Sequence, residues 1–162
     1  ILDYNRVISD LNGQTETSIL EGIADKFSVS KEEQAVRPAH SKQFGMYING
    51  NWYRLDINDN IVPYEDPVAR LDVSLLHNNL IEPLLGISDP RTDNRIDFVG
   101  GIRGLAELEK RVDSGEMNIA FSFFATTMED LMAVADANEV MPPKSTWFEP
   151  KLADGLVSLV LD

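Results

Sequence analysis

Residues 44–57 constrain the fold more than any other part of the sequence. Asn49-Gly50 stands at the centre of this stretch, and both residues accept the positive φ angles that a two-residue type I′ turn requires. The turn sets the register of the flanking strands, so that Met46 lies opposite Tyr53 and the large apolar side chains share one face. A shift of one residue would turn these side chains to the other face. The sequence therefore predicts a half-buried β-hairpin.

Apolar spacing predicts further strands on either side of this hairpin. They are expected at residues 2–11, 95–99, 118–124 and 156–161. Residues 30–42 are polar and contain Pro38, which is typical of an exposed connection.

Capping residues and four-residue apolar spacing predict the helices. Ser18 and Glu21 have the spacing of a capping box. Pro83 falls late in a leucine-rich helix and should kink it, because proline lacks the amide that the helix needs. In chain order, the predicted helices begin near Thr15 or Ser18, Asp72, Ile102 and Thr126.

These elements follow the order β-α-β-β-α-β-α-β-α-β. Alternating helices and strands are typical of α+β and α/β proteins, and we predict an α+β fold with a single mixed β-sheet covered by helices. The first six elements have the order of a ferredoxin-like unit. No linker divides the chain, so residues 1–162 are predicted to form one domain. The chain begins with Ile1 in a strand-like pattern, and we expect it to be the C-terminal fragment of a longer protein.

The charge and composition of the chain exclude several functions. It has 27 acidic residues against 14 basic ones, a net charge of −13, and such a surface repels the phosphate backbone of nucleic acids. The absence of cysteine excludes disulfides, thiol catalysis and cysteine metal sites. The sequence shows neither an apolar run of membrane-spanning length nor a signal-peptide pattern. We therefore predict a cytoplasmic protein whose present segment has no nucleic-acid or membrane partner.

Residues 141–152, MPPKSTWFEPKL, form the first candidate site. Three prolines stiffen the loop, and Lys144, Ser145 and Thr146 place a cation beside two hydroxyl groups, as an anion site requires. Prolines stand where a P-loop has glycines, which excludes a Walker-type site. A structural turn whose lysines lie along the aromatic rings explains the same composition.

The second candidate is the turn at residues 99–104, VGGIRG, between a predicted strand and helix. Helix N-termini attract anions through their free amide groups. Gly100 and Gly101 would let a ligand approach the backbone, and Arg103 could add a charged contact. The full dinucleotide-binding pattern is absent, and a tight strand-to-helix turn is the alternative interpretation.

Asp97, Glu149 and Lys151 are secondary candidates. Asp97 interrupts an apolar strand, so it either faces solvent or lies in a cleft where its pKa is shifted. The two histidines, His40 and His77, have no partner at metal-ligand spacing and are interpreted as surface or helix-face residues. No metal site is predicted.

Five phrases of the sequence resemble a known family: YNRVISDLNG, FGMYINGNWYRL, RLDVSLLHNNLIEPLLGI, DNRIDFVGG and VMPPKSTWFEPKLADGLV. They are similar to the C-terminal part of the bacterial domain-of-unknown-function family 1015, over nearly the whole chain. Members of this family are often labelled ParB-like or Spo0J-like. The resemblance implies an N-terminal part with an Asp-Gly-His-His-Arg motif, similar to the core of the ParB and sulfiredoxin superfamily, and this motif does not occur in the present sequence.

The resemblance implies two functions of different classes. In the first, the longer protein is a phosphoryl-transfer or nucleotide-using enzyme, and this domain completes a phosphate- or nucleotide-related small-molecule site with the N-terminal part. Lys144, Ser145, Thr146 and Arg103 would then contact phosphate, the nucleotide would belong to the longer protein, and the present chain would be inactive alone. In the second, the domain serves a partition or regulatory protein through dimerisation or partner binding, without catalysis. A purely structural domain is a third interpretation.

Overall fold

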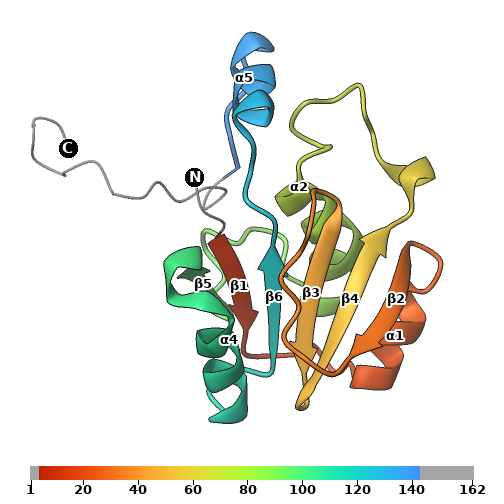
Figure 1. The fold of residues 1–162 in the computed structure, drawn as a ribbon, viewed down its shortest axis with the longest axis vertical. Coiled ribbons are helices and arrows are strands. Elements are labelled where there is room, and N and C mark those ends of the chain that lie inside the picture. The colour runs from red at the N-terminus through yellow and green to blue at the C-terminus, as the bar shows by residue number, and fades with distance from the viewer. Residues whose placement is uncertain (1–3, 143–162) are drawn as a thin grey trace, which may run out of the picture.

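One antiparallel β-sheet forms the centre of the computed structural model, which describes residues 4–142 (Figure 1). The six strands lie in the order β2-β4-β3-β6-β1-β5, and every neighbouring pair is antiparallel. The predicted α+β class is confirmed, whereas the predicted mixed sheet is wrong. The strands are β1 (Tyr4–Ile8), β2 (Phe27–Glu32), β3 (Gln43–Ile48), β4 (Asn51–Ile57), β5 (Ile96–Gly100) and β6 (Ile119–Phe123).

The position of β1 explains why the sheet is not mixed. Helix α4 (Gly104–Asp113) connects β5 with β6, and these two strands run in the same direction because both are antiparallel to β1. They would be parallel neighbours if they touched, but β1 lies between them and pairs with both.

The hairpin of β3 and β4 forms as predicted. Asn49 and Gly50 have φ angles of 54° and 81°, as a type I′ turn requires. Met46 pairs with Tyr53, in the predicted register. Both side chains are buried in the larger of two apolar clusters.

Strand β2 was not predicted. Helix α1 (Glu16–Ile23) ends before Phe27, and Phe27 begins an edge strand that pairs with β4. The ring of Phe27 packs edge-on against Phe44, with 6.1 Å between centroids. The first six elements are therefore not in ferredoxin-like order, and residues 30–42 begin within a strand. The capping box of α1 joins Thr15 with Ser18 and not Ser18 with Glu21.

The leucine-rich helix at residues 72–85 contains a wide turn. It comprises α2 (Asp72–Leu76), the π-helical segment η2 (His77–Ile81) and α3 (Glu82–Leu85). The amide of Glu82 donates to the carbonyl of His77, five residues back. Pro83 follows directly, and its ring would collide with a carbonyl four residues back in a regular α-helix. Pro83 therefore disturbs the helix as predicted, and the disturbance is this wide turn.

Asp72 does not cap this helix as predicted, because Leu71 occupies the N-cap position. The Asp72 carboxylate instead accepts hydrogen bonds from Ser41 Oγ at 2.9 Å and from the backbone amide of Lys42 at 3.0 Å. It therefore holds the loop before β3 against the start of α2.

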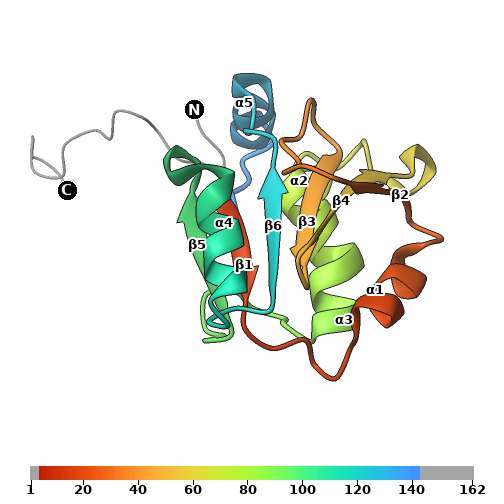
Figure 2. The same cartoon turned by 60° about the horizontal axis from the view of Figure 1, so that its bottom comes forward.

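The helices cover both faces of the sheet. Helices α1, α2 and α3 bury the larger apolar cluster on one face, where α1 and α3 lie side by side (Figure 2). Helix α4 covers a smaller cluster on the other face, which includes Val7, Trp52 and Leu108. Two short 3₁₀ turns complete the connections, η1 (Asp59–Ile61) and η3 (Gly101–Arg103).

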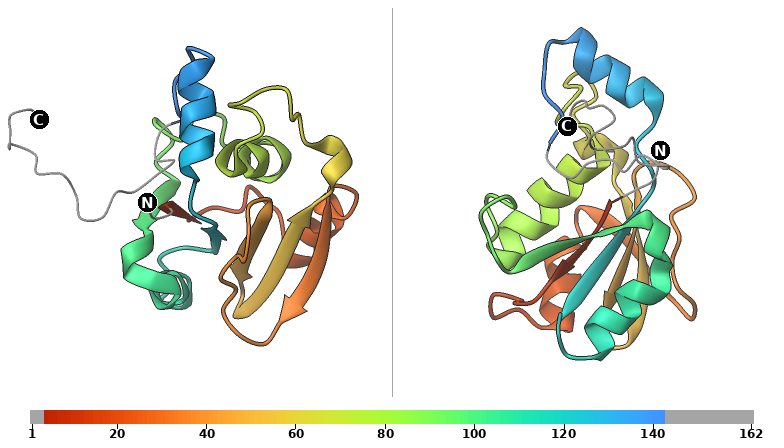
Figure 3. Two further views of the ribbon diagram at one scale, coloured as in Figure 1. Left: turned by 45° about the horizontal axis from the view of Figure 1, so that its top comes forward. Right: turned by 90° about the vertical axis from the view of Figure 1, so that its left-hand side faces the viewer.

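Helix α5 (Met128–Asp136) stands beyond the end of β6 and projects from the sheet (Figure 3). Its cap is Thr127, one residue after the predicted Thr126, and the Thr127 side chain accepts a hydrogen bond from the amide of Asp130. Val134 anchors α5 in the larger apolar cluster. The strand predicted at residues 156–161 lies outside the described residues. In residues 4–142, no helix has the length and apolar character of a membrane span.

Candidate functional site

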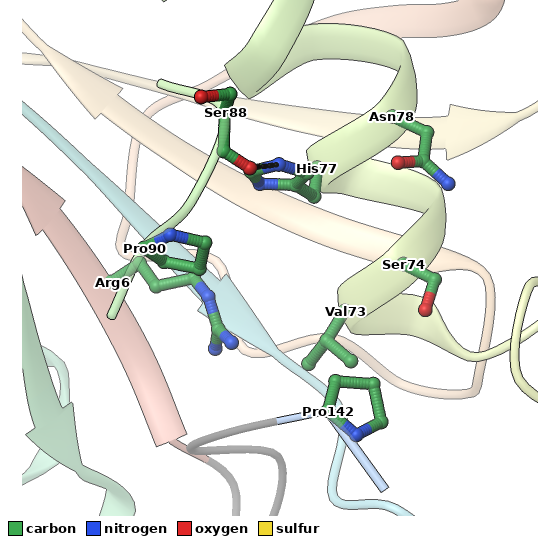
Figure 4. A pocket seen from close by; sticks show the side chains of 8 residues that line it. All are labelled: Arg6, Val73, Ser74, His77, Asn78, Ser88, Pro90 and Pro142. Atoms are coloured by element: carbon green, nitrogen blue, oxygen red, sulfur yellow. Dashed lines mark hydrogen bonds between the residues drawn. The ribbon is translucent and has the colours of Figure 1, made fainter. Parts of the chain in front are cut away.

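A pocket of about 170 Å³ lies between β1 and the helix of residues 72–85 (Figure 4). Strand β1 contributes Arg6, and the segment after α5 contributes Pro142. The loop after α3 contributes Ser88 and Pro90. The helical wall consists of Val73, Ser74, His77 and Asn78. Four segments that are distant in the sequence therefore meet at this pocket.

Arg6 is the unusual residue of the pocket because its side chain is charged and only 4% exposed. Its guanidinium carbon lies 5.1 Å from the ring centre of Phe98 and 5.0 Å from that of Phe123. These rings come from β5 and β6, on opposite sides of β1, so aromatic rings flank the cation from both sides. Its Nη1 donates a hydrogen bond to the carbonyl of Tyr4 at 3.1 Å.

Within the described residues, the charge of Arg6 is not matched by an acidic side chain. No carboxylate in residues 4–142 forms an ion pair with it within 4.0 Å. Burial lowers the pKa of Arg6 to about 10, so the side chain is still a cation at neutral pH. An unmatched buried cation is costly. The geometry therefore favours an anionic ligand that offsets this cost.

The helical wall supplies polar groups opposite Arg6. His77 Nε2 lies 3.1 Å from the carbonyl oxygen of Ser88, and because a carbonyl only accepts, this nitrogen carries the proton. The side chains of Ser74 and Asn78 have no hydrogen-bond partner within the described part of the chain, which leaves both able to contact a ligand. The π-helical segment that carries His77 and Asn78 is a kind of irregularity found frequently at functional sites.

The carboxylate of Asp89, next to the pocket, is paired with an arginine. Asp89 stands between two lining residues, and both of its carboxylate oxygens accept hydrogen bonds from Arg91 at 3.1 Å. This contact lowers the pKa of Asp89. Its charge therefore opposes an incoming anion less than that of an unpaired carboxylate would.

The predicted glycine turn lies elsewhere. Gly100 ends β5 opposite Tyr4, Gly101 and Arg103 belong to the 3₁₀ turn η3, and Arg103 is exposed. None of these three residues lines the pocket over Arg6. The turn leads into α4, which covers the opposite face of the sheet. Its anion-binding role stays a prediction, separate from this pocket.

The other predicted site residues divide between two parts of the chain. Lys144, Ser145, Thr146, Glu149 and Lys151 lie outside the described residues. The first part of their loop is described, however, and its proline at position 142 lines the pocket. The loop that was selected from the sequence therefore starts at the pocket over Arg6.

Asp97 is exposed, and its carboxylate accepts a hydrogen bond from Arg111 at 2.8 Å. His77 was interpreted as a helix-face residue, and it lines the pocket. Arg6 was missed altogether. The available signal was its place in β1, because period-two alternation puts it on the same face as the buried Ile8.

Comparisons with known proteins agree with part of the predicted resemblance. A family described as a protein of unknown function (DUF1015) matches residues 1–74, which confirms the resemblance to this family for that part of the chain. The correspondence to the C-terminal part of the family stays a prediction. No curated protein matches the chain. Neither the family description nor the names of the similar structures contain ParB or Spo0J, so these labels stay a prediction.

Two solved structures match the chain at low sequence identity. A mutant of a free serine kinase in complex with AMP has 15% identity and a TM-score of 0.52, and the match covers 90% of this chain and 52% of the kinase. A conserved hypothetical protein from Pyrococcus furiosus has 15% identity and a TM-score of 0.48, with 90% and 53% coverage. The chain thus spans about half the length of each. At this identity the likeness to the kinase shows the fold alone.

Proposed function

We propose that the pocket over Arg6 binds the phosphate of a small molecule or nucleotide, and that this domain completes such a site together with the N-terminal part of a longer protein. The observation that carries the proposal is the buried guanidinium of Arg6, which has no carboxylate partner in residues 4–142. Arginine pairs well with phosphate because its planar donors match the geometry of the phosphate oxygens.

The shared fold supports a phosphate-containing ligand as the first to test. The similar kinase structure was solved in complex with AMP. By the same analogy, the longer protein would be a phosphoryl-transfer or nucleotide-using enzyme. We expect catalysis to require that longer protein, and the present domain to contribute binding.

The loop that follows the pocket supports the same ligand. Lys144 comes two residues after Pro142, which lines the pocket. Two residues of extended chain span at most roughly 7 Å. Lys144, Ser145 and Thr146 therefore belong to the proposal as additional phosphate contacts, with Arg103 as a more remote candidate.

An amide NMR titration of the chain with inorganic phosphate and ADP tests this function. We expect saturable shifts at residues 73–78 and 88–89, and at residues 144–146. In Arg6→Met the shifts at the first two segments should disappear. As a control, Arg37→Met removes the same charge from an exposed residue outside the pocket and should leave the titration unchanged. Shifts at residues 73–78 and 88–89 that persist in Arg6→Met would contradict the proposal, and so would the absence of any shift at millimolar ligand.

One observation favours a second function, partner binding through α5. Met128 and Met132 are 58% and 59% exposed, and their four-residue spacing puts them on one side of the helix. Exposed apolar side chains on a projecting helix are typical of an interaction surface. If a second copy of the chain binds here, the mass measured by light scattering should rise with protein concentration, and Met128→Ser with Met132→Ser should prevent that rise. A monomeric mass at all concentrations would exclude dimerisation.

A further inference from the structure

The size of the pocket over Arg6 limits what can enter it. Its volume is about 170 Å³. An apolar cavity of roughly 150 Å³ holds one benzene molecule, whereas pockets that bury a drug-sized ligand measure roughly 300–1,000 Å³. A phosphate group with a few further atoms fits this space. A nucleoside does not fit beside the phosphate.

The surroundings of Arg6 limit how a ligand can approach it. Phe98 and Phe123 flank the guanidinium, and Nη1 donates to the carbonyl of Tyr4. The remaining N–H groups form no further hydrogen bond within residues 4–142. A ligand must therefore meet the edge of the guanidinium, in its plane. Oxyanions with two or more terminal oxygens suit such an approach.

The helical wall distinguishes between two such anions. A carboxylate has two terminal oxygens, and Arg6 alone can satisfy both of them. A phosphomonoester has a third terminal oxygen and more charge. The hydroxyl of Ser74 and the amide of Asn78 line the same pocket without hydrogen-bond partners in residues 4–142. These donors suit the additional oxygen.

We infer that the pocket takes a small phosphomonoester, with the phosphate against the edge of Arg6 and the Ser74 and Asn78 side chains, and that any nucleoside remains outside. This inference rests on the proposed function and narrows its ligand. It implies that a nucleotide binds this domain only through its phosphate. The adenosine part of AMP should then add little to affinity.

Calorimetric titration of the 162-residue chain tests the inference with phosphoserine, AMP, adenosine, serine and acetate as probes. We expect phosphoserine and AMP to bind with dissociation constants within about threefold of each other. Adenosine, serine and acetate should not bind at millimolar concentration. AMP that binds at least about tenfold more tightly than phosphoserine would overturn the inference, and so would acetate that binds as tightly as phosphoserine.

A charge placed on the helical wall gives a second test that does not disturb the core. Asn78 is exposed and lines the pocket, so Asn78→Asp should weaken phosphoserine binding about tenfold or more by repulsion. Asn60→Asp makes the same charge change at an exposed residue outside the pocket and should have little effect. Equal affinities of the two variants would overturn the inference.

The titrations distinguish a failure of the proposed function from a failure of the narrower ligand class. If neither phosphoserine nor AMP binds the unmodified chain, the proposed function and the narrower ligand class are both wrong. If AMP binds far more tightly and Arg6→Met abolishes that binding, the proposed function holds and the restriction to small phosphomonoesters is wrong.

Discussion

Arg6 carries a buried charge that can serve either packing or ligand binding. Its contacts with Phe98 and Phe123 stabilise the folded state, and buried cation–π contacts contribute about 2 kcal/mol or more each. Against this, desolvation of an unpaired ion costs several kcal/mol. The two terms are of similar size, and we expect the cost to exceed the gain unless an anion binds. Stability and binding should therefore respond in opposite directions when the charge is removed.

At the residue scale, we predict that Arg6→Met raises the free energy of unfolding by about 1–3 kcal/mol without ligand. Methionine keeps much of the side-chain volume and adapts to the aromatic surroundings. Urea unfolding in a buffer without phosphate measures the effect. The control Arg37→Met, at an exposed position, should change the free energy by less than about 0.5 kcal/mol. A loss of more than about 2 kcal/mol in Arg6→Met would identify Arg6 as a structural residue.

At the element scale, Arg95 joins the end of α3 to the start of β5. It donates hydrogen bonds to the carbonyls of Leu85 and Gly86 at 3.3 and 2.8 Å, and its ion pair with Asp93 holds it in place at 2.6 Å. The link matters for the site because the pocket-lining loop lies between α3 and β5. Arg95 lowers the pKa of Asp93 from 3.8 to about 2.

The sign of the resulting pH dependence follows from that lowered pKa. Asp93 contributes stability above its unfolded pKa of 3.8, and the contribution disappears as the pH falls toward about 2. Asp93→Asn should therefore lower the free energy of unfolding by about 1 kcal/mol at pH 7 and have a much smaller effect near pH 2. Urea unfolding of both proteins across this range measures the difference, with Asp25→Asn at an exposed position as control. An equal difference at both pH values would contradict the pKa assignment.

At the scale of the whole molecule, the net charge of −13 opposes the compact state by self-repulsion. Salt screens this repulsion, with a Debye length of about 10 Å at 0.1 M. We predict that the melting temperature rises by a few degrees, roughly the effect of 1 kcal/mol, between 0.02 and 0.5 M sodium chloride. Thermal unfolding followed by circular dichroism measures this.

Phosphate separates screening from binding in the same experiment. At equal ionic strength, phosphate should raise the melting temperature more than chloride does if it binds the native pocket as proposed. The additional rise should be absent in Arg6→Met. A melting temperature that falls with salt would mean that the ion pairs of the surface outweigh the repulsion.

The elements whose formation depends on residues close together in the sequence could be predicted. The hairpin register follows from Asn49 and Gly50 because both strands and their turn lie within a short stretch. Strand β2 was missed since it is an edge strand with several polar and exposed residues, and the strand it pairs with, β4, comes about twenty residues later. Such a strand has little hydrophobic signal of its own.

The candidate site could be predicted only in part. The loop after position 141 was chosen for its composition, and Pro142 does line the pocket. Arg6 could not be recognised as a candidate binding residue, because the absence of a carboxylate partner in residues 4–142 is a property of the folded environment. The residues next to Arg6 in the sequence do not reveal this property, since the residues around a buried side chain come from distant parts of the chain.

The sequence by itself therefore determined the hairpin, most helices, the α+β class and the strong negative charge, all of which depend on local order or on composition. Folding decided the strand order, because pairing between distant segments depends on the free energy of the whole core. It also decided the pocket, where Arg6 meets the helical wall and the loop after α3. Burial changes the chemistry of Arg6, since a cation that water would solvate at the surface needs an anion when it is enclosed.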